Sequence, residues 1–345
     1  MNQVDKDILL RLLRQHESLG ISQQIDYQKF YLYSIITHST AIEGSTVTEV
    51  EAQLLFDEGI TSSKRTIVEQ MMNLDLKAAY EYGMEWMKRH EDITTEWLVS
   101  LAAKVMARTG AEYHSPSGDF SAAKGELRKL NVTAGLGGRS YMSYLKVPQR
   151  LETFCNELNR RRRSLDKTDV AAIYELSFWA HYELVTIHPW ADGNGRMSRL
   201  LMNLLQMEYG VLPTKVLKED KAEYIQSLID TREQEDVSIF ARCMTKLHCA
   251  HLRHDIEQYE RSIDTEKGTQ EEEKSTQETK ASTQEIILSE MRKNPKITRN
   301  ELAEIIGITP DGIKKQLDKL RKAGIIKHIG STKAGEWVVI QDQWG

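Results

Sequence analysis

A polar segment from Arg261 to Thr283 divides this chain of 345 residues and limits what the chain can fold into. Glu, Gln, Ser, Thr and Lys dominate the segment, and apolar side chains are nearly absent from it. Such a composition cannot bury enough apolar surface to offset the entropy of ordering the backbone. We therefore expect a linker at 261–283, with separately folded regions before and after it.

The region before the linker has helical periodicity almost throughout, which predicts a mainly α fold. The segment 92–108 is typical, because its large apolar side chains recur at helical spacing and would line one face: Ile93, Trp97, Leu101 and Val105. A second apolar run, Ala171 to Ile187, stops immediately before His188 and Pro189. Proline disfavours helical backbone in the residue before it, so we expect that helix to end with His188 at its edge.

One stretch interrupts the helical pattern, between Gly125 and Pro148. β-Branched and aromatic residues flank a glycine-rich turn at 135–138. This arrangement predicts a β-hairpin in an otherwise helical region. A long loop is the alternative interpretation.

The residues after the linker, 284–345, have the pattern of an α+β winged helix-turn-helix domain. Thr298 and Glu301 form a capping box at the start of one helix, and Gly307 and Gly324 follow the ends of two helices. The expected order is three helices and then two strands, at 286–291, 301–306, 311–323, 325–329 and 337–340.

The third of these helices carries an excess of positive charge that suits contact with phosphates. Its charged residues are Lys314, Lys315, Lys319, Arg321 and Lys322 against Asp311 and Asp318. Base reading needs Arg, Asn or Gln on the exposed face, and only Gln316 meets that need. DNA binding and a protein-docking or dimerisation role are therefore both open, and so is a homodimer.

The whole-chain charge of −5 gives no general argument for nucleic-acid or acidic partners. No stretch approaches the ~18 apolar residues of a membrane span, and Met1 to Leu10 lacks the features of a secretory signal. The three cysteines, Cys155, Cys243 and Cys249, form no paired framework. We expect a cytoplasmic protein with reduced thiols and no membrane partner.

The residues that carry chemistry lie in the string HPWADGNGRMSR, from His188 to Arg199. A glycine turn that leads into a helix places free backbone N–H groups and the positive end of the helix dipole at one point, which favours anions such as phosphates. Asp192 is a hard oxygen ligand of the kind that Mg²⁺ takes beside phosphates. Arg196 and Arg199 share one helix face, and His188 is a candidate general base. Together they predict a nucleotidyl-transfer site.

This string resembles the Fic signature HPFxDGNGRxxR, with Trp190 in place of the usual phenylalanine. The resemblance implies a helical core that transfers AMP from ATP to a Ser, Thr or Tyr hydroxyl of a target protein docked on the hairpin 125–148. It implies that His188 deprotonates the hydroxyl and that Asp192 holds Mg²⁺. It also implies a nucleotide-binding set of Gly193, Asn194, Gly195, Arg196 and Arg199, with Tyr224 at the adenine unless that tyrosine only packs the core.

A second motif lies upstream, where Ser39, Glu43 and Gly44 resemble the Fic inhibitory pattern [S/T]xxxE[G/N]. The resemblance implies that Glu43 pairs with Arg199 in a bidentate contact and leaves ATP bound unproductively. The alternative is a solvated glutamate at a helix end. The sequence thus predicts a domain order of 1–90 (inhibitory region), 91–255 (catalytic core), 261–283 (linker) and 284–345 (winged helix).

The predicted function is ATP- and Mg²⁺-dependent protein adenylylation restrained by Glu43. Two other readings stay open at this point. One is a winged-helix DNA-binding regulator that senses nucleotide, although such a protein would not need both His188 and Asp192. The other is an enzyme that also removes AMP from its target.

Overall fold

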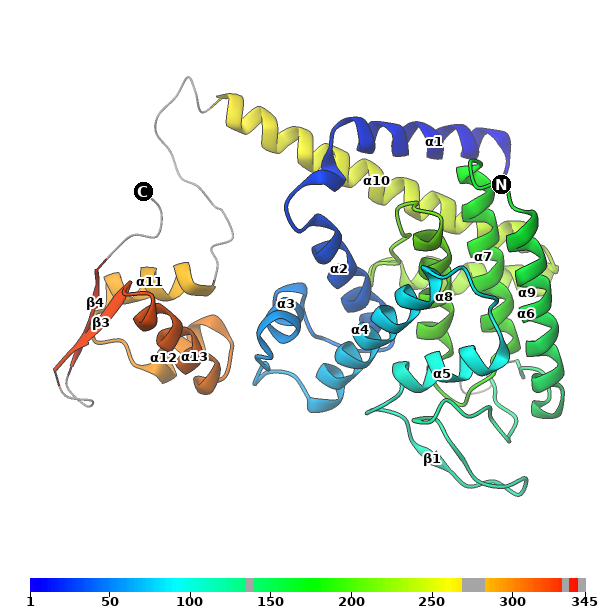
Figure 1. Cartoon of the computed structure of the whole chain (residues 1–345), viewed down its shortest axis with the longest axis horizontal. Helices are drawn as coiled ribbons and strands as arrows, with labels where there is room; N and C mark the ends of the chain where they lie inside the picture. Colours follow the sequence, from blue (N-terminus) through cyan, green and yellow to red (C-terminus); the bar gives the residue numbers. More distant parts are fainter. Residues whose placement is uncertain (135–138, 269–282, 331–334, 341–345) are drawn as a thin grey trace. The chain divides into compact units, whose positions relative to one another are not determined.

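The computed structural model describes residues 1–134, 139–268, 283–330 and 335–340 (Figure 1). The described part is predominantly helical, with short antiparallel strand pairs, so the predicted fold class is confirmed. The chain divides into two units, each of which is treated by itself. The first comprises Met1–Glu49 and Ile67–Glu266, and the second comprises Val50–Thr66 and Lys267–Gly345.

The first unit is a bundle of α-helices with a small strand pair. Its elements are α1 (Gln3–Ser18), η1 (Ile21–Gln23), α2 (Tyr27–Ile42), α4 (Ile67–Met87), α5 (Thr95–Val105), β1 (Glu112–Tyr113), β2 (Phe120–Ser121), η2 (Tyr144–Lys146), α6 (Val147–Ser164), α7 (Val170–Ile187), α8 (Asn194–Glu208), α9 (Lys221–Gln234) and α10 (Val237–Gly268). Helix α7 packs against α8, and α4 packs against α2, α5 and α8.

One apolar core joins helices that are far apart in the sequence. Leu9 and Leu12 of α1 meet Leu252 and Ile256 of α10 in it, and α1 runs beside α10 in Figure 1. The core continues to Phe178 and to the neighbouring aromatic side chains of α7, α9 and α10, which are Tyr174, Tyr182, Tyr224 and Phe240. Burial of this apolar surface holds α7 and α8 in fixed positions.

Helix α7 ends where the sequence predicts. Ile187 is its last residue, and His188 adopts the left-handed conformation with φ 52°. Residues other than glycine seldom take a positive φ, so the backbone at His188 is held in place by its surroundings. The predicted helix at 92–108 is also present as α5, which Thr94 caps by accepting a hydrogen bond from the N–H of Trp97.

The hairpin expected between Gly125 and Pro148 is formed over a short length. Thr133 and Ser140 make a single antiparallel bridge, and the N–H of Tyr141 donates to the carbonyl of Val132 at 3.0 Å. The glycine turn at 135–138 lies outside the described residues. The segment then enters η2 and α6, because Pro148 suits the first turn of a helix.

The second unit contains the winged helix-turn-helix domain in the predicted order. Its elements are α11 (Thr283–Lys293), α12 (Arg299–Ile306), α13 (Pro310–Lys322), β3 (Ile326–Ile329) and β4 (Glu336–Val339). The capping box of Thr298 and Glu301 is present. Strand β3 pairs with β4 in antiparallel register, with His328 opposite Trp337.

This unit also contains a segment that the sequence analysis placed in the region 1–90. Helix α3 (Glu49–Glu58) and the residues after it, up to Thr66, group with the winged helix. The reason is apolar burial, because Ile60 belongs to the core cluster of Ile313 and Leu317. The described helix α10 likewise extends into the expected linker, as far as Gly268. Among the described residues, no helix has the length and apolar character needed to cross a membrane.

Candidate active site

The His188 imidazole stands at the end of α7 with one nitrogen engaged. Its Nδ1 lies 3.2 Å from the carbonyl oxygen of Val185, so Nδ1 carries the proton and Nε2 is the acceptor. Burial lowers the pKa of this imidazole to about 4. The ring is therefore neutral at pH 7, the form that a general base requires.

Tyr141 covers one face of that imidazole. The two rings are nearly parallel, with centroids 3.8 Å apart and 17° between their planes. Arg232 of α9 holds this part of the hairpin, since it donates to the carbonyl of Ser140 and places its guanidinium 5.2 Å from the Tyr141 ring. The sequence analysis missed Tyr141 and Arg232, because no local signal relates them to His188.

Arg128 connects the hairpin segment with the end of α7. This side chain is almost fully buried, with 1% of its surface exposed. Its guanidinium donates to the carbonyls of His188, Leu130 and Met142, at 2.8, 2.8 and 2.6 Å. One buried cation thus ties the hairpin to the end of α7. The sequence analysis missed this residue as well.

The loop from Trp190 to Asn194 is held by its own side chains. The Asn194 amide accepts from the N–H of Trp190 at 3.1 Å and donates to its carbonyl at 2.8 Å. Gly193 has φ 82°, and its N–H donates to Asp192 at 2.6 Å. The Trp190 indole donates to the carbonyl of Gly125 at 2.9 Å, so the swap from phenylalanine gains an anchoring hydrogen bond. The amide of Asn194 thus shapes the loop, and its contact with phosphates remains a prediction.

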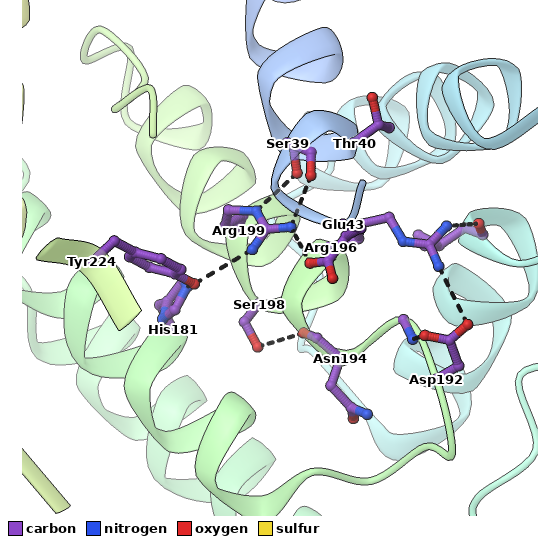
Figure 2. A network of polar contacts seen from close by, with 12 residues as sticks. Ser39, Thr40, Glu43, His181, Asp192, Asn194, Arg196, Ser198, Arg199 and Tyr224 are labelled. Carbon is purple, nitrogen blue, oxygen red and sulfur yellow. Dashed lines mark hydrogen bonds and ion pairs between the residues drawn. The ribbon is translucent and has the colours of Figure 1, made fainter. Parts of the chain in front are cut away.

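The first turn of α8 brings the predicted anion-binding groups together. Arg196 is buried, and its Nη2 lies 3.8 Å from Asp192 Oδ2 (Figure 2). Its Nε has no hydrogen-bond partner among the described residues. A buried N–H without a partner costs about 1–3 kcal/mol, so the site is stabilised by an incoming acceptor.

Arg199 is the centre of the polar network in Figure 2. Its Nε donates to Ser39 Oγ at 2.9 Å, and its Nη2 donates to the Ser39 carbonyl at 3.0 Å and to Glu43 Oε1 at 2.6 Å. The expected pairing with Glu43 is therefore present, but the bidentate geometry was wrong. Arg199 donates two hydrogen bonds to Ser39, and Glu43 accepts one hydrogen bond from Arg199.

The Glu43 carboxylate lies directly against the glycine loop. A Cβ atom on Gly195 would be only 2.5 Å from Glu43 Oε1, so the absence of a side chain admits the carboxylate. Burial raises the pKa of this carboxyl, but the charge and hydrogen bond of Arg199 outweigh burial and hold the pKa below its ordinary value. Glu43 is ionised at neutral pH and occupies the anion-binding end of α8.

The end of α2 that carries Glu43 is anchored to α4. The Thr40 hydroxyl contacts the buried side chain of Asn73 at 3.1 Å, and Asn73 donates to Ser45 at 3.3 Å. Gly44 has φ 105°, a conformation that favours glycine after a helix. The motif Ser39–Gly44 is thus a helix end locked by tertiary contacts.

Tyr224 is placed beside Arg199 with 1% of its surface exposed. Its hydroxyl lies 3.5 Å from Arg199 Nη1 and 2.9 Å from Nε2 of His181, a buried residue that the sequence analysis missed. Tyr224 therefore packs in the apolar core, which was one of its two expected roles. Its place at the adenine remains a prediction.

A magnesium ion fits this site only together with phosphates. Asp192 is an exposed carboxylate at the mouth of the loop, with 58% of its side chain accessible. The described residues hold no group of three or more His, Cys, Asp or Glu that could bind a metal by themselves. Mg²⁺ is commonly held by one or two carboxylates and the substrate phosphates, and Asp192 meets that requirement.

Two segments of the chain match known families. Residues 92–206 match the Fic/DOC family, and residues 282–327 match the winged helix-turn-helix DNA-binding family. Protein adenylyltransferase fic-1 of Caenorhabditis briggsae is 26% identical over 244 residues, which are 70% of this chain and 43% of that protein. Protein adenylyltransferase Fic of Drosophila melanogaster is 28% identical over 66% of this chain and 42% of that protein. The chain thus spans less than half the length of these relatives.

Solved structures share the fold. A Fic domain-containing signalling protein from Bacteroides thetaiotaomicron superposes with a TM-score of 0.60 and 20% identity, over 73% of this chain and 98% of that one. A Fic family protein from Desulfovibrio desulfuricans has a TM-score of 0.55 and 16% identity, over 98% of this chain and 97% of that one. The chain therefore shares the fold of these Fic proteins, and its segment 92–206, which matches the Fic/DOC family, is followed by a segment that matches winged helix-turn-helix domains.

Proposed function

We propose that this protein is an adenylyltransferase that moves AMP from ATP to a hydroxyl of a target protein and is restrained by Glu43. The observation that carries the proposal is the meeting of three features at the start of α8. A neutral histidine whose Nε2 is the acceptor nitrogen stands just before the N-terminal end of α8, and a carboxylate already lies at that helix end. The names of the curated relatives support the same reaction.

His188 supplies the base in this reaction. Its Nε2 takes the proton from the target hydroxyl as that oxygen attacks the α-phosphorus of ATP. The bond from the α-phosphorus to the bridging oxygen breaks, and pyrophosphate leaves. The hydrogen bond to Val185 and the stacked Tyr141 ring fix the direction of the acceptor nitrogen.

The start of α8 stabilises the phosphates. The backbone from Gly193 to Gly195 and the guanidinium of Arg196 offer N–H donors to their oxygens. Asp192 would hold Mg²⁺, which would supply charge neutralisation on those oxygens. An extended target segment adds as a strand to the short hairpin around Thr133 and Ser140, whose next residue, Tyr141, stacks on His188.

Glu43 restrains transfer by pairing with Arg199, the side chain that the end of the ATP triphosphate needs. Arg199 donates hydrogen bonds to Ser39 and Glu43, and the Glu43 carboxylate fills the space over Gly195. Its negative charge also repels a phosphate from the same position. ATP then binds without the alignment that the attack requires.

The test is self-labelling with Mg²⁺ and ATP carrying a label on the α-phosphate. The parent protein is compared with Glu43→Gly, His188→Ala and, as a control for the glycine substitution, Glu17→Gly on an exposed face of α1. We expect strong labelling of Glu43→Gly and weak labelling of the parent and of Glu17→Gly. His188→Ala, alone or with Glu43→Gly, should carry no label.

ATP labelled on the γ-phosphate separates this reaction from phosphoryl transfer, because adenylylation leaves that label in pyrophosphate. Label from γ-labelled ATP on the protein would contradict the proposal. So would a Glu43→Gly protein that binds ATP and takes up no label from either form.

A further inference from the structure

The segment Val50–Thr66 belongs to the second unit and is held together by its own hydrogen bonds. Helix α3 is followed by a return stretch, and Glu51 ties the two together by accepting hydrogen bonds from Ser62 and Arg65, each at 2.8 Å. Ile60 is 3% exposed and lies in the core cluster of the winged helix. The segment thus has its own internal hydrogen bonds, and the buried side chain of Ile60 packs into the winged-helix core.

Helix α13 is covered on two faces. One face, with Ile313, Leu317 and Leu320, packs into the core of the winged helix itself. A second face carries Gly312, Gln316 and Lys319, which fall at helical spacing of four and three residues. A core face is expected for any helix of this domain. On the second face Gly312 and Gln316 are buried as well, whereas the side chain of Lys319 stays 56% exposed.

The segment Val50–Thr66 makes the contacts to that second face. A Cβ atom on Gly312 would be 3.0 Å from Ile60 Cγ2, so Ile60 lies directly against the helix backbone. The Gln316 amide donates to the Glu58 carboxylate, and Lys319 Nζ lies 3.0 Å from Glu58 Oε2. Gln316 is completely buried, so the expectation that it lies on the exposed face of its helix was wrong, and its amide oxygen also accepts from Gln284 of α11 at 2.9 Å.

These contacts take up the groups that would read a nucleic acid. In a helix-turn-helix domain the second helix of the motif, here α13, enters the major groove. Gln316 is the residue of α13 whose amide suits a base edge, and Glu58 accepts the hydrogen bond that this amide would give to such an edge. The basic residues that α13 leaves exposed are Lys314, Lys315, Lys319, Arg321 and Lys322, of which Lys319 also pairs with Glu58.

We propose that the segment Val50–Thr66 is an internal ligand of α13 that keeps a nucleic-acid duplex from this face. The segment and a duplex cannot share Gly312 and Gln316, so a duplex binds there only after the segment has left. The side chains that contact the winged helix include Glu58 through its charge, and Ile60 and Leu54 through apolar packing. This inference does not depend on the proposed transfer reaction.

The test is binding of a fluorescently labelled 30-base-pair duplex of mixed sequence to the full chain, followed by anisotropy at low salt. Glu58→Gln removes the carboxylate, and Ile60→Ser removes the apolar anchor. Glu304→Gln is the matched control, because it makes the same change of charge on an exposed position of α12 in the same unit. Thermal unfolding checks that each variant is folded.

We expect the parent to bind weakly and Glu58→Gln and Ile60→Ser to bind at least about fivefold more tightly, with Glu304→Gln close to the parent. Fivefold corresponds to the net contribution of one hydrogen bond, about 1 kcal/mol. Three outcomes would overturn the proposal. They are equal affinity of the parent and all variants, an equal gain in Glu58→Gln and Glu304→Gln, and no duplex binding by any folded variant.

Discussion

Two glutamates of the same stretch of chain, Glu43 and Glu58, lie on cationic or donor groups of two different units. Glu43 contacts Arg199 at the start of α8, and Glu58 contacts Gln316 and Lys319 on α13. In both units a carboxylate occupies a surface suited to phosphates. The two contacts differ in how far the cation is removed from water.

Burial separates the two contacts. The Arg199 side chain is 3% exposed, whereas that of Lys319 is 56% exposed. Water and salt screen an exposed pair, which typically contributes about 0–1 kcal/mol. A hydrogen bond to a buried charged group contributes about 1.5–3 kcal/mol. We therefore expect Glu43 to act as a strong restraint and the charge of Glu58 as a weak one.

The largest expected effect is that of Glu43→Gly on nucleotide transfer. Removal of a contact of about 1.5–3 kcal/mol corresponds to a rise of about 10- to 150-fold in self-labelling rate. Glu58→Gln serves as the comparison and should raise the rate far less. Equal acceleration by the two variants would mean that the two contacts act as one device, and the comparison drawn above would fail.

The pH profile of transfer should depend on Tyr141. In the Glu43→Gly background, burial keeps the pKa of His188 at about 4, so the rate should hold as pH falls through 6 and decline only near pH 4. Tyr141→Ala exposes the imidazole, which moves its pKa up toward the ordinary 6.5. Loss of activity on acidification should then begin at higher pH.

Rates between pH 4.5 and 8 measure this shift, and Tyr141→Phe is the control because it keeps the stacked ring. If the rate of Tyr141→Ala declines at the same acidic pH as that of its parent, the ring does not shield His188 from water. In that case the stacking contact has no part in setting the protonation of the base.

Ser39→Ala should have an intermediate effect. It removes the hydrogen bond from Arg199 Nε to the Ser39 hydroxyl but leaves the carbonyl contact and Glu43 in place. Loss of one such bond, about 1 kcal/mol, corresponds to a roughly fivefold rise in self-labelling. Ser34→Ala on the same helix is the control, and an equal rise there would assign the effect to a general loosening of α2.

The smallest expected effect is the coupling between Glu58 and Lys319. A double-mutant cycle of Glu58→Gln and Lys319→Met, followed by thermal unfolding, should give about 0.2–1 kcal/mol in low salt and almost nothing in 0.5 M NaCl. If the coupling free energy of the pair persists in high salt, the pair is less accessible to water than its exposed fraction indicates. The distinction between a buried and an exposed restraint would then disappear.

Signals carried by neighbours in the sequence predicted much of the molecule. The proline after His188 marked the end of α7, and the spacing of Thr298 and Glu301 marked the start of α12. The glycines around Asn194 marked the loop before α8. Each of these features follows from steric limits and hydrogen bonds within a few residues, and such information is local by nature.

Only the tertiary structure decided which distant groups meet. Nothing near Tyr141 in the sequence places its ring on His188, and nothing near Ile60 assigns Val50–Thr66 to the winged helix. The preference of Arg199 for a two-pronged contact with Ser39 likewise depends on the packing of α2 beside α8. These choices arise from burial of apolar surface and from the need to satisfy buried donors, which act between segments that are far apart in the chain.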